Sequence, residues 1–158
     1  MRHLALAAAL AAGLSTAALA HHDEEVVQAG SVLVSHAWMV ANADMAHATG
    51  VYLTLDNRGT SADRLVAAEA EFAGRTVFQA QTLGTDGTLQ VQDVTAVRIQ
   101  PNQVLTLQPG VAWIELKGLQ RVHAPGETFE LALTFEKGGR AEIVVHVEKA
   151  RGPGEPAA

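Results

Sequence analysis

The sequence contains no cysteine. Disulfide bonds are therefore excluded, and so are thiolate zinc sites and blue copper sites, which need a cysteine ligand. Basic residues are also few, because 11 Lys and Arg stand against 17 Asp and Glu, for a net charge of −6. This acidic balance argues against nucleic acid or an anionic membrane surface as a partner, since both favour basic patches. The sequence also has no HExxH motif, no Gly-rich phosphate loop and no recognisable Ser-His-Asp set. We therefore expect a binding protein, not an enzyme.

The first twenty residues have the three parts of a secretory signal peptide. A short positive start, Met1-Arg2-His3, precedes an apolar run at residues 4–14, and Ala18-Leu19-Ala20 supplies the small residues that signal peptidase reads. The apolar run is too short to cross a bilayer, which needs about 20 residues, and no later segment is long and apolar enough. The sequence thus predicts an exported, periplasmic protein cut after Ala20, with His21 as the first mature residue.

The rest of the chain has the pattern of short β-strands. Apolar, β-branched and aromatic residues alternate roughly with polar ones, and Gly, Pro, Asn and Asp mark turns between the segments. The expected strands are residues 31–38, 51–57, 64–72, 76–83, 89–94, 104–108, 112–116, 128–136 and 141–148. No helical periodicity of useful length is present. This pattern predicts one all-β domain over residues 21–149, an antiparallel β-sandwich or barrel, followed by a Pro- and Gly-rich flexible tail at 150–158.

Several stretches in order resemble a known family. They include the Tyr-Leu-Thr-Leu strand that ends in Asn57-Arg58-Gly59, the Ala-Asp-Arg-Leu at 62–65, and the Leu-Gln-Pro-Gly at 107–110 leading to Gly118-Leu119. Together they are similar to the periplasmic copper chaperone domain PCu(A)C, over roughly residues 28–149. The resemblance implies a cupredoxin-like, Greek-key β-sandwich and a role in carrying or buffering copper.

The chain departs from this family at the usual copper site. The resemblance aligns the two His and two Met ligands of the family with Gln79, Val91, Trp113 and Glu115. Thioether and imidazole groups are the ligands that hold Cu(I), and none of the four positions supplies one. We therefore expect the usual Cu(I) site to be lost.

An N-terminal histidine offers a different kind of copper site. The α-amine and the ring Nδ1 of His21 can chelate one metal, and one further imidazole would complete three nitrogens. Such a histidine brace, which some relatives without the usual ligands use, suits Cu(II), because Cu(II) favours tetragonal nitrogen and oxygen surroundings. The α-amine has an ordinary pKa near 8, so a strong metal can displace its proton. We expect one Cu(II) per chain. The second imidazole is either His47, which has Asp44 nearby as a ligand or supporting carboxylate, or His36.

Other readings of these residues stay open. His21 and His22 could form a plain polar start of the mature chain. His123 is expected in a turn, His146 as a packed or edge residue of the last strand, and Met45 as a loop or core residue, since thioether suits Cu(II) poorly. A histidine brace can also activate oxygen, but this small domain does not resemble the copper oxygenases. The expected partners are a copper ion and a copper enzyme or transporter that receives it. The alternative is a metal-free β-sandwich that assists the assembly of a copper enzyme.

Overall fold

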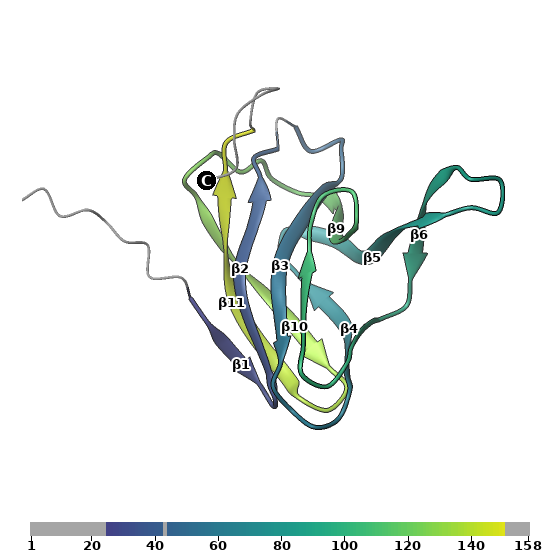
Figure 1. Ribbon diagram of the computed structural model, residues 1–158. Helices are drawn as coiled ribbons and strands as arrows, with labels where there is room; N and C mark the ends of the chain where they lie inside the picture. Colours follow the sequence, from purple (N-terminus) through teal and green to yellow (C-terminus); the bar gives the residue numbers. More distant parts are fainter. Residues whose placement is uncertain (1–24, 43, 151–158) are drawn as a thin grey trace, which may run out of the picture.

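Every regular element of the described chain is a β-strand, as expected from the sequence (Figure 1). The computed structural model describes residues 25–42 and 44–150. The predicted signal peptide, the cut after Ala20 and the expected ligand His21 lie outside the described residues. The strands are β1 (Val27–Ala29), β2 (Val32–Val40), β3 (Thr49–Asn57), β4 (Asp63–Glu69), β5 (Ala73–Leu83), β6 (Leu89–Val94), β7 (Val97–Ile99), β8 (Gln103–Leu107), β9 (Ala112–Leu119), β10 (Thr128–Phe135) and β11 (Gly139–Glu148).

Each strand expected from the sequence is present, with ends that differ by a few residues. The strands were predictable because apolar and polar side chains alternate along them. In β3, for example, Val51, Leu53 and Leu55 are buried and Tyr52 and Thr54 face outward. Two short strands, β1 and β7, were not expected. Each exists because it pairs with a longer strand, β1 with β2 and β7 with β4.

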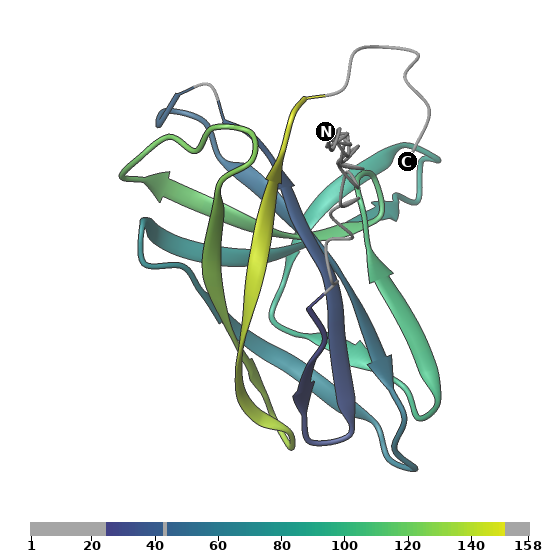
Figure 2. The same cartoon turned by 90° about the vertical axis from the view of Figure 1, so that its left-hand side faces the viewer.

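The strands form one sheet that curves around a single core (Figures 1 and 2). Their hydrogen-bonding order is β6-β5-β9-β3-β2-β11-β10-β4-β7, with β1 also paired to β2 and β8 to β3. The pairs are antiparallel as predicted, except that β11 runs parallel to β2. Figure 2 shows β11 between β2 and β10, so the last strand of the domain lies beside its first long strand.

Two strands share one edge of β2. β1 pairs with the first part of that edge, at Val32–Val34, and β11 pairs with the last part, at Trp38–Val40. Between these parts the pairing of β2 with β3 on its other edge shifts register, and His36 has a φ of 54°. This is a β-bulge with a left-handed residue, a conformation that His adopts more readily than most residues. The bulge leaves His36 exposed.

At the other end of the domain, the turn after β1 packs against the turn between β10 and β11. Gly30 has a φ of 59°, and a Cβ atom on it would lie 2.7 Å from the Cα of Gly138. A Cβ atom on Gly138 would in turn lie 2.5 Å from the carbonyl oxygen of Ala29. The buried carboxylate of Asp63 fixes the same turn, because it accepts hydrogen bonds of 3.0 Å from the backbone N–H groups of Lys137 and Gly138. These contacts set the position of β11 relative to β1 and β4.

Candidate metal site

The positions of the family's usual copper ligands lie together on the outer face of the sheet. Gln79 of β5 pairs with Trp113 of β9, and Glu115 is the next residue of β9 on that face. Val91 of β6 pairs with Gln81, the next residue of β5 on the same face. The four positions are therefore neighbours on three adjacent strands, β6, β5 and β9.

The side chains at these positions do not form a Cu(I) site. The Gln79 amide donates a hydrogen bond of 2.8 Å to Asp93 Oδ1, and the Glu115 carboxylate lies 3.0 Å from Lys117 Nζ. Burial, together with the charge of Glu115, raises the pKa of Tyr52. Amide and carboxylate oxygens are hard ligands, whereas Cu(I) takes soft thioether and imidazole ligands. The donor set found here therefore does not fit the family's usual metal.

The structure brings Asp44 and His47 together in the loop between β2 and β3. His47 Nδ1 lies 2.8 Å from Oδ1 and 3.0 Å from Oδ2 of Asp44. The hydrogen bond from the His47 ring is the main cause of a lowered pKa of Asp44. The backbone N–H groups of Ala46 and His47 also donate to Asp44 Oδ1. The carboxylate therefore orients the imidazole and leaves Nε2 as the ring atom that could bind a metal.

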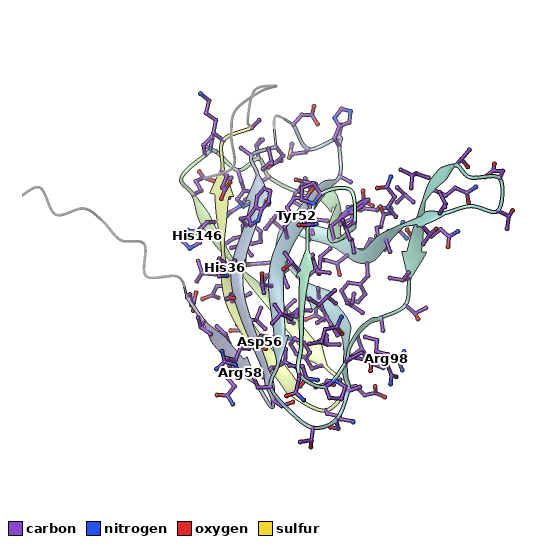
Figure 3. All side chains as sticks on the ribbon, in the orientation of Figure 1. His36, Tyr52, Asp56, Arg58, Arg98 and His146 are labelled. Atoms are coloured by element: carbon purple, nitrogen blue, oxygen red, sulfur yellow. The ribbon has the colours of Figure 1, made fainter. Side chains whose placement is uncertain are left out.

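Two further histidines, His36 and His146, lie on the outer face of β2 and β11 (Figure 3). His146 is half-buried between the inward-facing Val145 and Val147, and it pairs with Trp38 of β2. His36 lies on β2 two residues before Trp38, the residue that pairs with His146. His36 and His146 thus lie on adjoining strands, β2 and β11, and are offset by two residues along the strand direction. The sequence predicted His146 as a packed or edge residue of the last strand, because the parallel pairing of β2 with β11 could not be read from the chain.

Glu25 connects the start of the described chain to this region. Its Oε2 accepts a hydrogen bond of 3.0 Å from the backbone N–H of Val144, a contact between residues 119 positions apart. Glu25 and Val144 therefore meet where β11 replaces β1 at the edge of β2. The sequence gave no sign of this contact.

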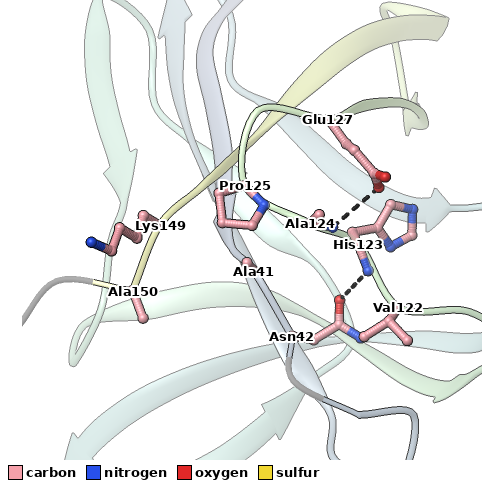
Figure 4. Close-up of a pocket in the computed structure, with 9 residues that line it drawn as sticks. All are labelled: Ala41, Asn42, Val122, His123, Ala124, Pro125, Glu127, Lys149 and Ala150. Atoms are coloured by element: carbon pink, nitrogen blue, oxygen red, sulfur yellow. Dashed lines mark hydrogen bonds between the residues drawn. The ribbon is translucent and has the colours of Figure 1, made fainter.

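His123 lies in a turn as expected, and it is also part of the core. It follows β9 in the turn as predicted, yet it is only 1% exposed, and its ring packs against Phe72 and Phe129 with centroid distances of 4.1 and 5.2 Å. Arg121 Nε donates a hydrogen bond of 2.8 Å to His123 Nε2. Burial lowers the pKa of His123, and the charge of Arg121 acts in the same direction. This histidine is a neutral core residue beneath a shallow pocket (Figure 4).

Within residues 25–42 and 44–150, no group of three or more His, Asp or Glu side chains is arranged to hold a metal ion. The same part of the chain has no helix long and apolar enough to cross a membrane.

The sheet is similar to solved structures of PCuAC domains and of a copper-bound β-domain protein. The apo PCuAC domain from PmoF1 superposes with a TM-score of 0.70 at 27% identity, covering 80% of this chain and 100% of that one. The copper-bound PCuAC domain from PmoF2 gives a TM-score of 0.67 at 23% identity, covering 80% and 98%. The Cu(I) form of DR1885 from Deinococcus radiodurans gives 0.60 at 26% identity, covering 72% and 75%. The fold is that of a PCuAC domain.

The model of the LpqE-like lipoprotein family matches residues 32–147, and the chain belongs to this family of PCuAC-type domains. No curated protein sequence matches the chain. Membership of a lipoprotein family is consistent with a location outside the cytoplasm. These 158 residues contain no cysteine to carry a thiol-linked lipid.

Proposed function

We propose that the protein binds one Cu(II) ion per chain and carries or buffers copper in the periplasm. The metal would be held by a histidine brace at the mature N-terminus, which signal peptidase creates by cutting after Ala20. The α-amine and Nδ1 of His21 would supply two nitrogens, and an imidazole of the folded domain the third. A copper enzyme or a copper transporter would receive the ion. Support for a copper role comes from membership of the family and from relatives solved with bound copper.

The observation that carries this proposal is the hydrogen bond from the Val144 N–H to Glu25 Oε2, which holds the start of the described chain beside β11. His21 lies four residues before Glu25 in the sequence, and four extended residues span at most about 14 Å. His146 follows Val144 by two residues on β11 and pairs with Trp38 of β2, and His36 precedes Trp38 by two residues. Both imidazoles are therefore within reach of an N-terminal chelate.

The same reasoning ranks His36 and His146 above His47 as the imidazole partner. His47 belongs to the loop beyond the end of β2 at Val40, about 13 Å along the strand from His36 at 3.3 Å per residue. A chelate at His21 could reach that loop only with the intervening residues almost fully extended. Asp44 and His47 then have a local role, in which the carboxylate orients an exposed imidazole.

Substitution of single histidines in the processed protein tests this assignment. Cu(II) titrations measure the affinity of His36→Ala, His146→Ala and His47→Ala. Electron paramagnetic resonance of each complex counts the nitrogen atoms bound to the metal. We expect His36→Ala or His146→Ala to lose affinity and one nitrogen, and His47→Ala to behave as the wild type. Bound Cu(II) should quench the fluorescence of Trp38, which pairs with His146, so Trp38→Phe should reduce the quenching and Trp113→Phe should not.

Two outcomes would contradict the proposal. Loss of the site in His47→Ala alone would move the imidazole partner to the loop between β2 and β3. An absence of Cu(II) binding by correctly processed protein would favour the alternative function, a metal-free adaptor for the assembly of a copper enzyme.

A further inference from the structure

We infer that β6 is a docking edge at which two copies of this chain pair, β6 against β6 in antiparallel orientation. The inference goes beyond the copper proposal and does not depend on it. β6 is the last strand at one end of the sheet, and among the residues that the structure describes it pairs with β5 alone. The other edge of β6 is therefore open to a further strand.

The backbone of β6 is oriented for such pairing. The carbonyl oxygen of Thr88, just before β6, accepts a hydrogen bond of 2.7 Å from the N–H of Gly84, so Thr88 faces β5. Successive residues of an antiparallel strand direct their backbone groups to alternate edges. Leu89 and Val91 thus direct theirs to the open edge, where the backbone of a second extended strand can bind them.

The side chains beside this edge are apolar and exposed. The register of β5 and β6 pairs Leu83 with Leu89 and Gln81 with Val91, which places the three aliphatic side chains on one face. Leu83 is 69% exposed, Leu89 67% and Val91 52%. Figure 1 shows the β5–β6 hairpin projecting from the rest of the sheet, and five of the six residues of β6 are exposed. Contiguous apolar surface of this kind marks an interaction site, because association removes it from water.

The opposite end of the sheet is protected in a way that β6 is not. The end strand there, β7, has only three residues, and the one at its centre, Arg98, is exposed (Figure 3). Short edge strands and charged side chains are among the features that keep sheet edges from pairing. β6 has six residues, Leu-Gln-Val-Gln-Asp-Val, with no Lys, Arg or Pro among them. The edge at β6 therefore lacks the protection that β7 has.

The distribution of charge on β6 fits a second copy of the same strand. Antiparallel pairing about a two-fold axis at Gln90 places Leu89 opposite Val91 of the second copy, and the symmetry repeats this apolar pair. Asp93, the only charged residue of β6, then lies opposite Gly87. Apolar pairs across strands stabilise a sheet, whereas like charges directly opposite each other destabilise it. Self-pairing therefore joins the apolar side chains and leaves no like charges opposed.

Sedimentation equilibrium of the metal-free mature protein tests this inference, with a chelator present so that no metal bridges two chains through exposed histidines. The concentration should extend to about 1 mM, because one pair of strands buries less than a standard interface of about 1,600 Å² and associates weakly. The variants are Leu89→Lys and Val91→Lys. Val104→Lys is the matched control, because Val104 is an equally exposed valine of another strand, β8, at 63%. Hydrogen exchange of the Leu89 and Val91 amides at low and high concentration locates the contact.

We expect the wild type to show an equilibrium between monomer and dimer. Leu89→Lys and Val91→Lys should each raise the dissociation constant about tenfold or more, because the symmetry removes two apolar pairs at once. Val104→Lys should dimerise as the wild type does. The amides of Leu89 and Val91 should exchange more slowly in the concentrated wild type.

A wild type that stays monomeric up to about 1 mM would overturn the inference. So would a dimer that both β6 variants still form with wild-type affinity, because the contact would then lie elsewhere. A monomeric wild type whose Leu89 and Val91 amides are protected by a synthetic peptide of alternating Val and Thr would assign the edge to a strand of a different protein, which also overturns self-pairing. None of these results changes the copper proposal, which metal binding tests separately.

Discussion

Replacement of Asp63 by alanine should destabilise the domain strongly, because its buried carboxylate holds the turn that positions β11. Oδ1 accepts from the N–H groups of Arg64 and Lys137, and Oδ2 accepts from that of Gly138. Alanine would leave the two N–H groups of the β10–β11 turn without their acceptor. Hydrogen bonds to charged groups contribute about 1.5–3 kcal/mol each, and water can replace part of this at the exposed Lys137. We therefore expect Asp63→Ala to lower the free energy of unfolding by about 2–4 kcal/mol.

Urea unfolding, followed by circular dichroism or tryptophan fluorescence, measures this loss. Asp86→Ala is the matched control, since Asp86 also accepts a backbone hydrogen bond, from Thr88, but does so in the exposed β5–β6 turn. Asp86→Ala should lower the free energy of unfolding by less than about 1 kcal/mol. If Asp63→Ala costs no more than Asp86→Ala, Asp63 does not hold the β10–β11 turn in the way described.

Two further outcomes follow from the structure. Gln79→Ala and Glu115→Gln should leave copper stoichiometry unchanged in Cu(II) titrations, because these positions keep the place of the family's site but not its ligands; a large loss of copper in either variant would show that the old site persists in altered form. Stability should fall as the pH drops below about 6.5, because there the unfolded chain protonates His123 while burial keeps the folded ring neutral. His123→Phe should flatten this acid limb of the stability curve in urea unfolding at several pH values, and an unchanged slope would contradict the neutral, buried state.

Local patterns in the sequence were enough to predict the strands but not all of their partners. The alternation of Val51, Leu53 and Leu55 with Tyr52 and Thr54 identifies both β3 and its buried face. β1 is only three residues long, and its existence depends on pairing with β2. The parallel pairing of β11 with β2 joins the two ends of the domain, so no local pattern could indicate it.

The candidate site was predictable to the same limited extent. Asp44 and His47 are close in sequence, and their contact follows from the loop that holds them. The neighbouring positions of Gln79, Trp113 and Glu115 followed from the family resemblance. The contact of Glu25 with Val144 depends on β1 and β11 sharing one edge of β2. That arrangement involves residues over a hundred positions apart, so the sequence alone could not decide between His36 and His47.

The most direct test of the copper proposal is the Cu(II) affinity of the processed protein compared with that of a chain carrying one additional glycine before His21. A brace needs the α-amine and the ring of one residue together, and the added glycine converts that amine into an amide, which binds copper only after losing its proton. We predict that the extended protein binds Cu(II) far more weakly than the processed one and loses its characteristic nitrogen coordination. Equal affinity in the two forms would contradict the brace and would locate the metal at the histidines of the folded domain alone.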